Sequence, residues 1–367
     1  MSLSVGIVGL PNVGKSTLFN AITNAHAEAS NYPFCTIEPN VGIVEVPDER
    51  LDVLSKLSNT QKIIPAIIKF VDIAGLVKGA SKGEGLGNKF LANIREVDAI
   101  AHVVRCFDDG NIIHVEGSVN PRRDVETIKL ELIYSDLETV EKRFGAVAKK
   151  AKSGDKESIV LNDILEKVKN VLSAGKLAIL ADLNDEQRII LKKELQLLTD
   201  KPVIYVGNIA ETEIGKEATN NYFQELKKIA AEDKAEVVAL SAKIESELSE
   251  LDKADADAML KDLGITESGL NKLAHSCFKL LGLQTYLTTG EKETRAWTIP
   301  IGAKAPQAAG VIHTDFEKNF IKAEVVSYAD LVREGSMSKA AEKGLLRLEG
   351  KEYVMRDGDV VVWKVGN

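Results

Sequence analysis

The sequence is poor in the residues that build disulfide scaffolds and membrane spans. Only three of its 367 residues are cysteine, and Cys35, Cys106 and Cys277 lie far apart with no Cys-x-x-Cys pair. We therefore expect neither a disulfide framework nor a structural zinc site, and we expect a reducing, cytoplasmic setting. There is no apolar run of about 18 residues, the length that a membrane-spanning helix needs, and the first four residues contain no basic segment. We expect no membrane span and no export.

An excess of basic residues is also absent. Lys and Arg number 47 against 55 for Asp and Glu, which gives a net charge of −8. No global positive field marks a nucleic-acid-binding protein, so we expect no DNA partner, and any RNA contact would come from local basic patches. Hydrophobic residues at 44% and charged residues at 28% are ordinary for a globular protein, and the length predicts two or three domains or one with large insertions.

Short apolar segments separated by helical stretches recur along the first 240 residues. The strand candidates are residues 5–9, 67–71, 99–105, 203–206 and 237–240. Continuous apolar runs of this length are typical of parallel strands that are buried on both faces. The pattern predicts an α/β fold in which helices cover a mostly parallel sheet, an architecture typical of nucleotide-binding domains.

A helical segment interrupts this alternation over residues 122–200. Apolar residues recur there at steps of three and four, the seam of a packed helix pair, at Leu130, Ile133, Leu137, Val140, Phe144 and Val147. Similar stepping resumes at residues 161–171 after a turn at 153–155. We predict an antiparallel helical arm inserted into an α/β domain of residues 1–282. Its tip fits either a solvated loop or a contact with an anionic surface, because it carries Lys149, Lys150, Lys152 and Lys156.

The last part of the chain has a different pattern. Residues 297–302, 320–326 and 360–365 read as strands, and a short helix is expected near residues 328–332. This is enough chain for a small independent domain. We predict a separate α+β domain over residues 283–367.

A phosphate-binding loop follows the first strand candidate. Residues 9–16, Gly-Leu-Pro-Asn-Val-Gly-Lys-Ser, match G-x-x-x-x-G-K-[ST] in full, between a strand candidate and a helix candidate. The glycines let backbone N–H groups surround the β-phosphate, Lys15 supplies charge to the β- and γ-phosphates, and the Ser16 hydroxyl binds Mg²⁺. The nucleotide-binding residues predicted in this loop are Asn12, Val13, Gly14, Lys15, Ser16 and Thr17.

Two further segments complete a predicted magnesium site. Asp72 ends a strand candidate and opens Asp-Ile-Ala-Gly, a D-x-x-G pattern whose Asp reaches Mg²⁺ through water and whose Gly N–H senses the γ-phosphate. Between the two motifs lies the segment 31–40, where Thr36 is the remaining candidate metal ligand. NTPases of this kind order and disorder such a segment with γ-phosphate occupancy. Beside Thr36, Cys35 fits either an inert core thiol or a redox-sensitive one.

These motifs together resemble the YchF family of Obg-like ATPases, which belongs to the translation-factor-related P-loop NTPases. The resemblance covers essentially the whole chain and includes residues 9–16, 31–40, 72–91, 104–109, 208–211 and 241–243. It implies a nucleotide-binding domain, a helical arm and a C-terminal TGS domain with a β-grasp fold. It also implies ATP and ADP as ligands and association with the ribosome or its large subunit. Contact with rRNA is an expectation that goes with this.

The motif that selects the base departs from the guanine-binding pattern N-K-x-D. Residues 208–211 read Asn-Ile-Ala-Glu, so Ile209 replaces the lysine and Glu211 the aspartate. The extra methylene of Glu211 moves its carboxylate off the bidentate position on guanine, which removes the advantage of GTP. We predict that Asn208, Ile209, Glu211 and Ser241 form the base site and that ATP is preferred, as the resemblance also implies. A degenerate site that still binds GTP is the alternative.

The residue that usually orients the attacking water is missing. Leu76 follows the D-x-x-G pattern where many relatives have glutamine, so intrinsic hydrolysis is expected to be slow. Asn12 resembles an asparagine that holds K⁺ between the phosphates in related NTPases, and a loop-capping role fits it equally. His114 follows a strand candidate, and the resemblance implies a histidine here that has been considered for catalysis. We predict Lys15 and His114 as catalytic residues, with a structural loop histidine as the alternative.

The sequence therefore predicts a Mg²⁺-dependent ATPase whose nucleotide state controls its binding to the ribosome. One alternative is a nucleotide-gated adaptor that binds other proteins and does not act on the ribosome. Another is a small-molecule kinase, which is disfavoured because a kinase needs an acceptor pocket and a lid, whereas the additions here read as a helical arm and a β-grasp domain.

Overall fold

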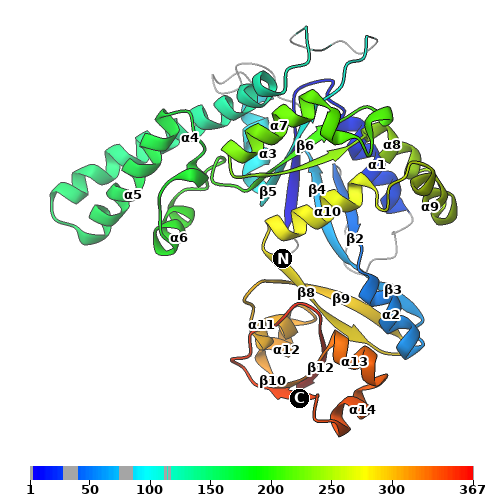
Figure 1. Cartoon of the computed structure of the whole chain (residues 1–367). Coiled ribbons are helices and arrows are strands. Elements are labelled where there is room, and N and C mark those ends of the chain that lie inside the picture. The colour runs from blue at the N-terminus through cyan, green and yellow to red at the C-terminus, as the bar shows by residue number, and fades with distance from the viewer. Residues whose placement is uncertain (1–2, 28–39, 74–85, 111–113, 115–116, 367) are drawn as a thin grey trace. The chain divides into compact units, whose positions relative to one another are not determined.

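A six-stranded sheet forms the centre of the first of two units (Figure 1). The protein is described here from a computed structural model, which covers residues 3–27, 40–73, 86–110, 114 and 117–366. The strand order is β2-β4-β1-β5-β6-β7, and every pairing among β4, β1, β5, β6 and β7 is parallel. This confirms the predicted α/β fold. The strands are β1 (Ser4–Val8), β2 (Val41–Val46), β4 (Ala66–Asp72), β5 (Ala99–Arg105), β6 (Val203–Asn208) and β7 (Glu236–Leu240).

The register of the central strands fixes one edge of this sheet. Ile7 of β1 lies opposite Asp72 of β4 on one side and Ala101 of β5 on the other. In parallel strands the carboxyl ends meet at the same edge, and ligands of open α/β sheets bind there. The loop that follows β1 therefore begins beside Asp72.

Helices pack on this sheet through their apolar faces. In α7, for example, Phe223, Leu226 and Ile229 are buried at steps of three, as expected of a helix with one face on a sheet. No described helix is long and apolar enough to cross a membrane. The helices of this part are α1 (Lys15–Ala27), α3 (Leu86–Glu96), α7 (Asn221–Glu232), α8 (Ala242–Leu248), α9 (Lys253–Asp262) and α10 (Gly269–Leu280).

A helical hairpin extends from the sheet, as predicted. It consists of α4 (Pro121–Lys152) and α5 (Lys156–Ser173), followed by α6 (Asp185–Glu194) (Figure 1). Asn120 caps α4 and Asp155 caps α5, each through a side-chain oxygen that accepts a backbone N–H bond in the first turn. The hairpin buries its own apolar seam, which includes Ile133, Val140, Val147, Leu161, Ile164, Leu165 and Val168.

One buried carboxylate anchors the base of this arm. Asp136 of α4 accepts hydrogen bonds from the N–H groups of Leu198 and Thr199 at 3.0 and 2.8 Å and from the Thr199 hydroxyl at 2.6 Å. Burial raises the pKa of Asp136, and these hydrogen bonds counteract the shift because they favour the ionised form. The arm is thereby fixed to the segment that leads into β6.

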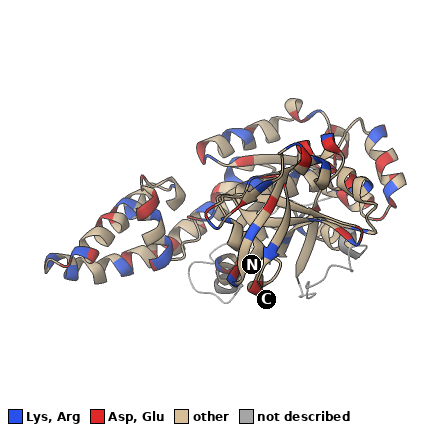
Figure 2. Ribbon diagram, turned by 90° about the horizontal axis from the view of Figure 1, so that it is seen from below, with Lys and Arg blue, Asp and Glu red and all other residues tan. Residues whose placement is uncertain are grey.

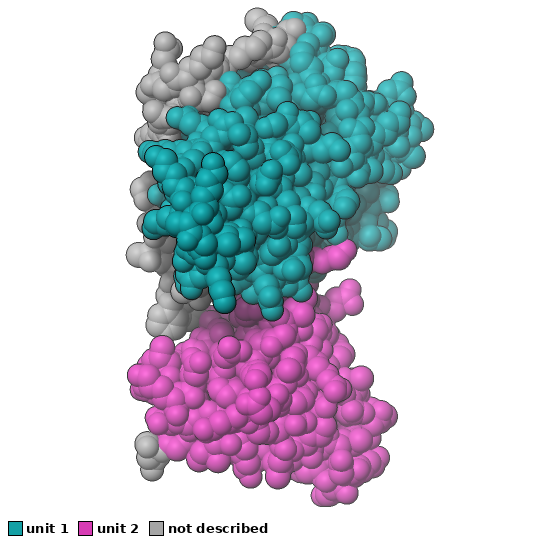
Figure 3. All heavy atoms as spheres, turned by 90° about the vertical axis from the view of Figure 1, so that its left-hand side faces the viewer, with its two compact units in different colours: residues 1–29, 36–42, 69–276 teal, residues 30–35, 43–68, 277–367 magenta. Residues whose placement is uncertain are grey.

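The second unit, magenta in Figure 3, contains another six-stranded sheet. The order of its strands is β11-β10-β12-β8-β9-β3. The predicted strands at residues 297–302, 320–326 and 360–365 correspond to β9, β10 and β12, and the predicted helix to α13. The elements are α2 (Glu49–Ser58), β3 (Lys62–Ile64), β8 (Leu283–Thr289), β9 (Glu293–Pro300), α11 (Ala305–Gly310), α12 (Thr314–Lys318), β10 (Phe320–Ser327), α13 (Tyr328–Glu334), α14 (Met337–Glu342), β11 (Arg347–Glu349) and β12 (Asp359–Val365).

The segment that contains α2 and β3 belongs to this second unit, although it is far from the rest of the unit in the sequence. Strand β3 pairs in parallel with β9, and Ile63 lies opposite Thr294. The Thr60 hydroxyl donates to the Gly290 carbonyl at 2.7 Å. The pairing of β3 with β9 was not predicted from the sequence, because periodicity identifies strands and helices but not the sheet in which a strand pairs. The predicted boundary at residue 283 remains a prediction.

An arginine network attaches α2 to the C-terminal sheet. Arg50 donates to Asp48 at 2.8 Å and to Asp357 at 2.8 Å, and it also donates to the Thr285 hydroxyl at 3.0 Å. These hydrogen bonds raise the pKa of Arg50. Gly358 leaves room for the guanidinium, since a Cβ there would lie 2.7 Å from an Arg50 nitrogen. The contacts join residues from both ends of the sequence.

Candidate functional site

The phosphate-binding motif forms a loop between β1 and α1 at the edge where the strands end. Asn12 and Gly14 adopt positive φ angles of 61° and 99°, and the Leu18 N–H donates to the Gly14 carbonyl as the helix begins. Glycine adopts the left-handed backbone conformation at little energetic cost, and asparagine adopts it at a lower cost than most other residues. The backbone conformation of Asn12 therefore supports a role in shaping the loop. From the sequence alone, this role and the binding of K⁺ had fitted Asn12 equally.

The side chain of Lys15 is folded into this loop. Its residue is 9% exposed, and its ammonium group donates to the Leu10 carbonyl at 2.7 Å. Burial lowers the pKa of Lys15 to about 8, while the charge of Asp72 acts in the opposite direction. A partly desolvated cation that a carbonyl holds within a phosphate loop is well placed to exchange that carbonyl for phosphate oxygens.

Asn208 connects this loop to the segment before α8. Its amide Nδ2 donates to the Val13 carbonyl at 2.9 Å, and its Oδ1 accepts from the Ala242 N–H at 2.9 Å. Gly14 is required beside it, because a Cβ there would lie 2.3 Å from Nδ2 of Asn208. Asn208 is therefore a positioning residue that holds two loops together. Ser241, buried at the start of α8, lies in the second of these loops.

Oxygen donors for a magnesium ion lie on either side of the loop. Ser16 is exposed at the start of α1, and Asp72 ends β4, where its N–H donates to the Asn40 carbonyl at 3.0 Å. Burial raises the pKa of Asp72, and Lys15 opposes this shift. A hydroxyl and a carboxylate suit Mg²⁺, which commonly binds few protein groups together with substrate phosphates. The described residues contain no cluster of three or more His, Cys, Asp or Glu for an all-protein metal site.

Several predicted positions lie outside the described residues. These are Cys35, Thr36 and Leu76. Most of residues 79–88, a glycine-rich run after the D-x-x-G pattern, also lies outside the described residues. Cys106 and Cys277 are both buried and form no disulfide, and burial raises the pKa of Cys106. Burial in apolar surroundings lowers the reactivity of a thiol, because the thiolate is the reactive form.

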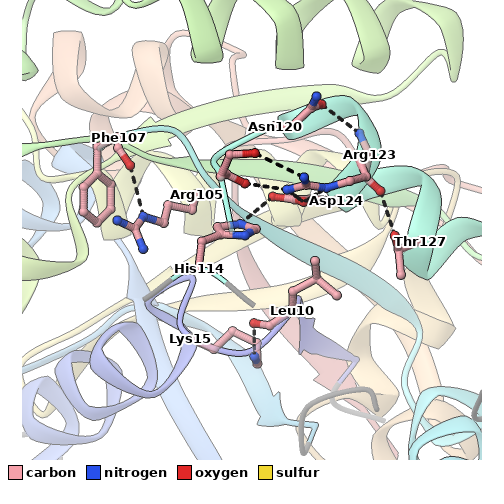
Figure 4. Close-up of polar contacts among 10 residues, drawn as sticks. Leu10, Lys15, Arg105, Phe107, His114, Asn120, Arg123, Asp124 and Thr127 are labelled. Carbon is pink, nitrogen blue, oxygen red and sulfur yellow. Dashed lines mark hydrogen bonds and ion pairs between the residues drawn. The ribbon is translucent and has the colours of Figure 1, made fainter. Parts of the chain in front are cut away.

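His114 forms a buried pair with a carboxylate that the sequence did not reveal. Its Nε2 lies 2.9 Å from Oδ2 of Asp124, in the first turn of α4, and the two side chains are 4% and 2% exposed (Figure 4). Arg123 donates to the other oxygen, Oδ1, at 2.9 Å. A carboxylate accepts hydrogen bonds, so Nε2 of His114 carries a proton in this pair. The ring therefore has a side-chain partner.

A buried arginine shapes the segment between β5 and His114. Arg105 ends β5 at 1% exposure, and its guanidinium donates to the Phe107 carbonyl at 3.0 Å (Figure 4). It also donates to the Asp109 carbonyl at 3.2 Å. In the same segment, the carboxylate of Asp108 accepts a hydrogen bond from the Tyr222 hydroxyl at 2.7 Å. Both Arg105 and Asp124 were missed from the sequence, because neither matches a motif with a known chemical role.

The two substitutions in the base-selection motif have separate structural consequences. Ile209 is 1% exposed and packs in a core cluster with Tyr205 and Phe223, so its side chain does not form a surface for a base. A contribution of position 209 to the base site, which would have to involve its backbone, stays a prediction. Glu211 is more exposed and forms an ion pair with Lys243 at 2.8 Å. Its carboxylate is therefore already engaged.

The comparisons with known proteins agree with this geometry. Residues 4–150 match a family described as 50S ribosome-binding GTPase, and residues 283–366 match YchF-GTPase_C, described as a protein of unknown function. The ribosome-binding ATPase YchF of Bacillus subtilis is 55% identical over 361 residues and that of Escherichia coli O157:H7 is 52% identical over 362, with 98% of each chain covered in both cases. The chain belongs to the YchF family.

A solved structure extends this assignment to three dimensions. The YchF GTPase of Schizosaccharomyces pombe superimposes with a TM-score of 0.88 at 41% identity, and the match covers 99% of this chain and 98% of that one. Family membership therefore extends over both units of the chain. It confirms the resemblance on which the expected P-loop NTPase fold and the TGS-like C-terminal sheet were based.

The lowered pKa of Lys15 makes nucleotide binding sensitive to pH. Phosphate oxygens favour the ammonium form, so the pKa of Lys15 rises on binding and the protein takes up protons when the pH is above about 8. We expect affinity for ATP to be constant below pH 7.5 and to fall above pH 8, by up to about tenfold per pH unit. Calorimetry in buffers of different ionisation enthalpy at pH 7.0 and 8.8 measures this uptake directly. Equal proton counts at the two pH values would contradict the burial of Lys15.

Proposed function

We propose that the protein is a Mg²⁺-dependent ATPase that prefers ATP to GTP and binds the ribosome according to its nucleotide state. The observation that carries the proposal is the phosphate loop, in which the Leu10 carbonyl accepts from Lys15 and Asn208 fixes the loop to the start of α8. Relatives at more than 50% identity are named ribosome-binding ATPases. A ribosomal partner would also place the protein in the cytoplasm.

The preference for ATP follows from two groups that are unavailable to guanine. The side chain of Ile209 is in the core, and the carboxylate of Glu211 is paired with Lys243. A guanine base would leave its N1–H and 2-amino donors without the bidentate acceptor that guanine-specific sites provide. Adenine makes no such demand, so ATP loses nothing.

Mg²⁺ supplies Lewis-acid stabilisation of the developing charge when it is bound with the nucleotide. Ser16 and Asp72 are the described residues that we assign to it, and Thr36 is the third candidate. Lys15 adds positive charge on the β- and γ-phosphates. Asn12, whose backbone shapes the loop, is the residue through which a K⁺ ion would be held.

Base choice and hydrolysis are tested together in steady-state kinetics with ATP and GTP. We expect kcat/KM for ATP to exceed that for GTP by at least about tenfold. Ser16→Ala removes a metal ligand and is expected to lower kcat by about 10² or more. Glu211→Asp shortens the side chain and breaks the pair with Lys243, so the preference for ATP over GTP is expected to narrow by about fivefold. Glu217→Asp is the control and is expected to leave this preference unchanged. Equal use of ATP and GTP by the unmodified protein would refute the proposed specificity.

His114 is the group that we assign to orienting the attacking water. Asp124 accepts from Nε2 at 2.9 Å and so orients the ring, and a histidine that a carboxylate orients can position water or accept a proton. Asp124→Asn can donate to the ring and reverse the tautomer. Asp124 is thus a positioning residue that acts through His114.

The pair predicts a non-additive pattern of kinetic effects. Both His114→Ala and Asp124→Asn are expected to lower kcat by about 10² or more with little change in the Kd for ATP. In the His114→Ala background, Asp124→Asn should have no further effect on kcat, because it acts through the missing ring. Asp108→Asn serves as the control, since it removes a carboxylate of the same segment that bonds to Tyr222. Additive losses would make Asp124 a purely structural residue.

The switch role is supported by the course of the chain around the site. Strands β2 and β4 are neighbours in the first sheet, and their site ends are joined by the hydrogen bond from Asp72 to Asn40. Between these strands the chain forms α2 and β3. Strand β3 pairs in the C-terminal sheet, and Arg50 of α2 donates a hydrogen bond to Asp357 in the same unit. A displacement at Asn40 or Asp72 on nucleotide binding therefore acts on a segment that the second unit incorporates.

This coupling is tested by hydrogen exchange with a non-hydrolysable ATP analogue and with ADP. We expect the two nucleotides to produce different protection in α2, β8 and β9. Arg50→Met removes the contacts with Asp357 and Thr285 and is expected to reduce that difference by at least about half while basal ATPase activity is retained. Lys351→Met, on the surface of the same unit, is the matched control. An identical response in Arg50→Met and the unmodified protein would show that the segment does not transmit the nucleotide state.

A further inference from the structure

A buried glutamate lies one turn after Ser241, a residue of the predicted base site. We call residues 241–243, where α8 starts, the base loop. Figure 2 shows acidic and basic residues interspersed along the helices, whereas Glu245 is 2% exposed and is the one described glutamate of the first unit that is buried. Burying a carboxylate is costly unless hydrogen bonds satisfy its oxygens. Glu245 therefore requires specific partners.

Both carboxylate oxygens of Glu245 accept hydrogen bonds from the start of α10. Oε1 accepts from the Gly269 N–H at 2.8 Å, and Oε2 accepts from the Leu270 N–H at 3.1 Å. Burial raises the pKa of Glu245, whereas these two hydrogen bonds and the charge of Lys272 favour the ionised form. The positive end of the α10 dipole also favours a carboxylate at this place. Glu245 thus joins two helices that α9 separates in the chain.

Helix α10 has a local cap in addition to this contact. The Ser268 hydroxyl oxygen accepts from the Asn271 N–H at 3.1 Å, which is the usual way in which the residue before a helix satisfies an N–H of the first turn. The first N–H groups of a helix have no partner within it, and at an exposed helix end water can satisfy them. The specific effect of Glu245 is therefore to fix α10 to α8.

The first turn of α10 also lies against the end of β7. A Cβ at Gly269 would lie 2.4 Å from Cβ of Leu240 and 2.8 Å from Oε1 of Glu245, so the backbone of α10 approaches both residues closely. The Leu240 carbonyl in turn accepts from the Ile209 N–H at 2.9 Å. The start of α10 therefore supports the strand end that bonds to the base-selection motif.

The base loop is held through its backbone at two points. The Ala242 N–H donates to Asn208, which also bonds to the phosphate loop. The N–H of Glu245 donates to the Ser241 carbonyl at 3.0 Å, while the Ser241 side chain makes no capping hydrogen bond to α8. The residue whose carboxylate binds α10 therefore also binds the base loop.

We propose that Glu245 is a positioning residue for the base of the nucleotide. By fixing α8 to α10 it holds the base loop in the conformation that the base meets. Its carboxylate bonds to α10 and to no described residue of the phosphate loop, so it acts on the base and not on the phosphates. This role rests on the nucleotide site of the proposed function and adds to it a residue that contacts neither phosphate nor metal.

The test compares two ligands that differ in whether they carry a base. ATP and inorganic tripolyphosphate, each with Mg²⁺, are titrated into the full-length protein in a calorimeter. Glu245→Gln keeps the size of the side chain but replaces one acceptor oxygen by a donating amide, so one N–H of α10 loses its partner. Asp136→Asn is the matched control, because Asp136 is also a buried carboxylate that accepts from two backbone N–H groups in the same unit.

We expect Glu245→Gln to weaken the binding of ATP about tenfold and that of tripolyphosphate by less than about twofold. Asp136→Asn should change neither Kd, although both substitutions should lower the melting temperature. Gly269→Ala disturbs the same contact from the side of α10 and should reproduce the selective loss, and it decides the question if Glu245→Gln does not fold.

Equal weakening of both ligands, or an unchanged Kd for ATP in the folded variant, would overturn the proposed role of Glu245 and leave the proposed function intact. A different result is expected if the proposed function is itself wrong. The unmodified protein would then bind ATP no more tightly than tripolyphosphate, and both proposals would fail together.

Discussion

The carboxamide of Asn208 holds together the two loops that frame the nucleotide site. Its donor and its acceptor are both used on backbone groups, the Val13 carbonyl and the Ala242 N–H, in a buried position. Gly14 must remain glycine for this contact to exist, since its φ is positive and its hydrogen faces the amide. An unsatisfied buried backbone group costs about 1–3 kcal/mol, so loss of the amide would release both loops at once. The phosphate loop is thus preorganised by a residue that sequence motifs associate with the base.

Lys15 and Asp72 show how the same site is prepared for charge. Burial disfavours the ionised form of both groups, and each favours the ionised form of the other. In the function proposed above, the phosphates would supply a partner for Lys15 and Mg²⁺ a partner for Asp72. Joint binding of nucleotide and metal would then be favoured over binding of either alone.

The sequence predicted the elements whose signal is local. The phosphate loop, the five buried strands and the seam of the arm all follow from motif or periodicity over fewer than about 30 residues, and the structure has each of them. It did not predict Asp124 as the partner of His114, nor the burial of Ile209, because both depend on packing between elements distant in the chain. The strands β2, β3 and β8 were also missed. Strand β3 has only three residues, and its pairing with β9 is a tertiary fact that no local pattern contains.

The interleaving of α2 and β3 with the C-terminal sheet has a consequence for synthesis. Strand β3 and helix α2 are made early, but β8 follows roughly 220 residues later and β12 about 300 residues later. At typical rates of about 5–20 residues per second, α2 and β3 wait roughly 15–60 s for the sheet that receives them. Arg50 donates hydrogen bonds to Asp357 and Thr285, and neither of these residues has been synthesised when α2 and β3 are first made. The second unit is therefore complete only after β12 has been synthesised.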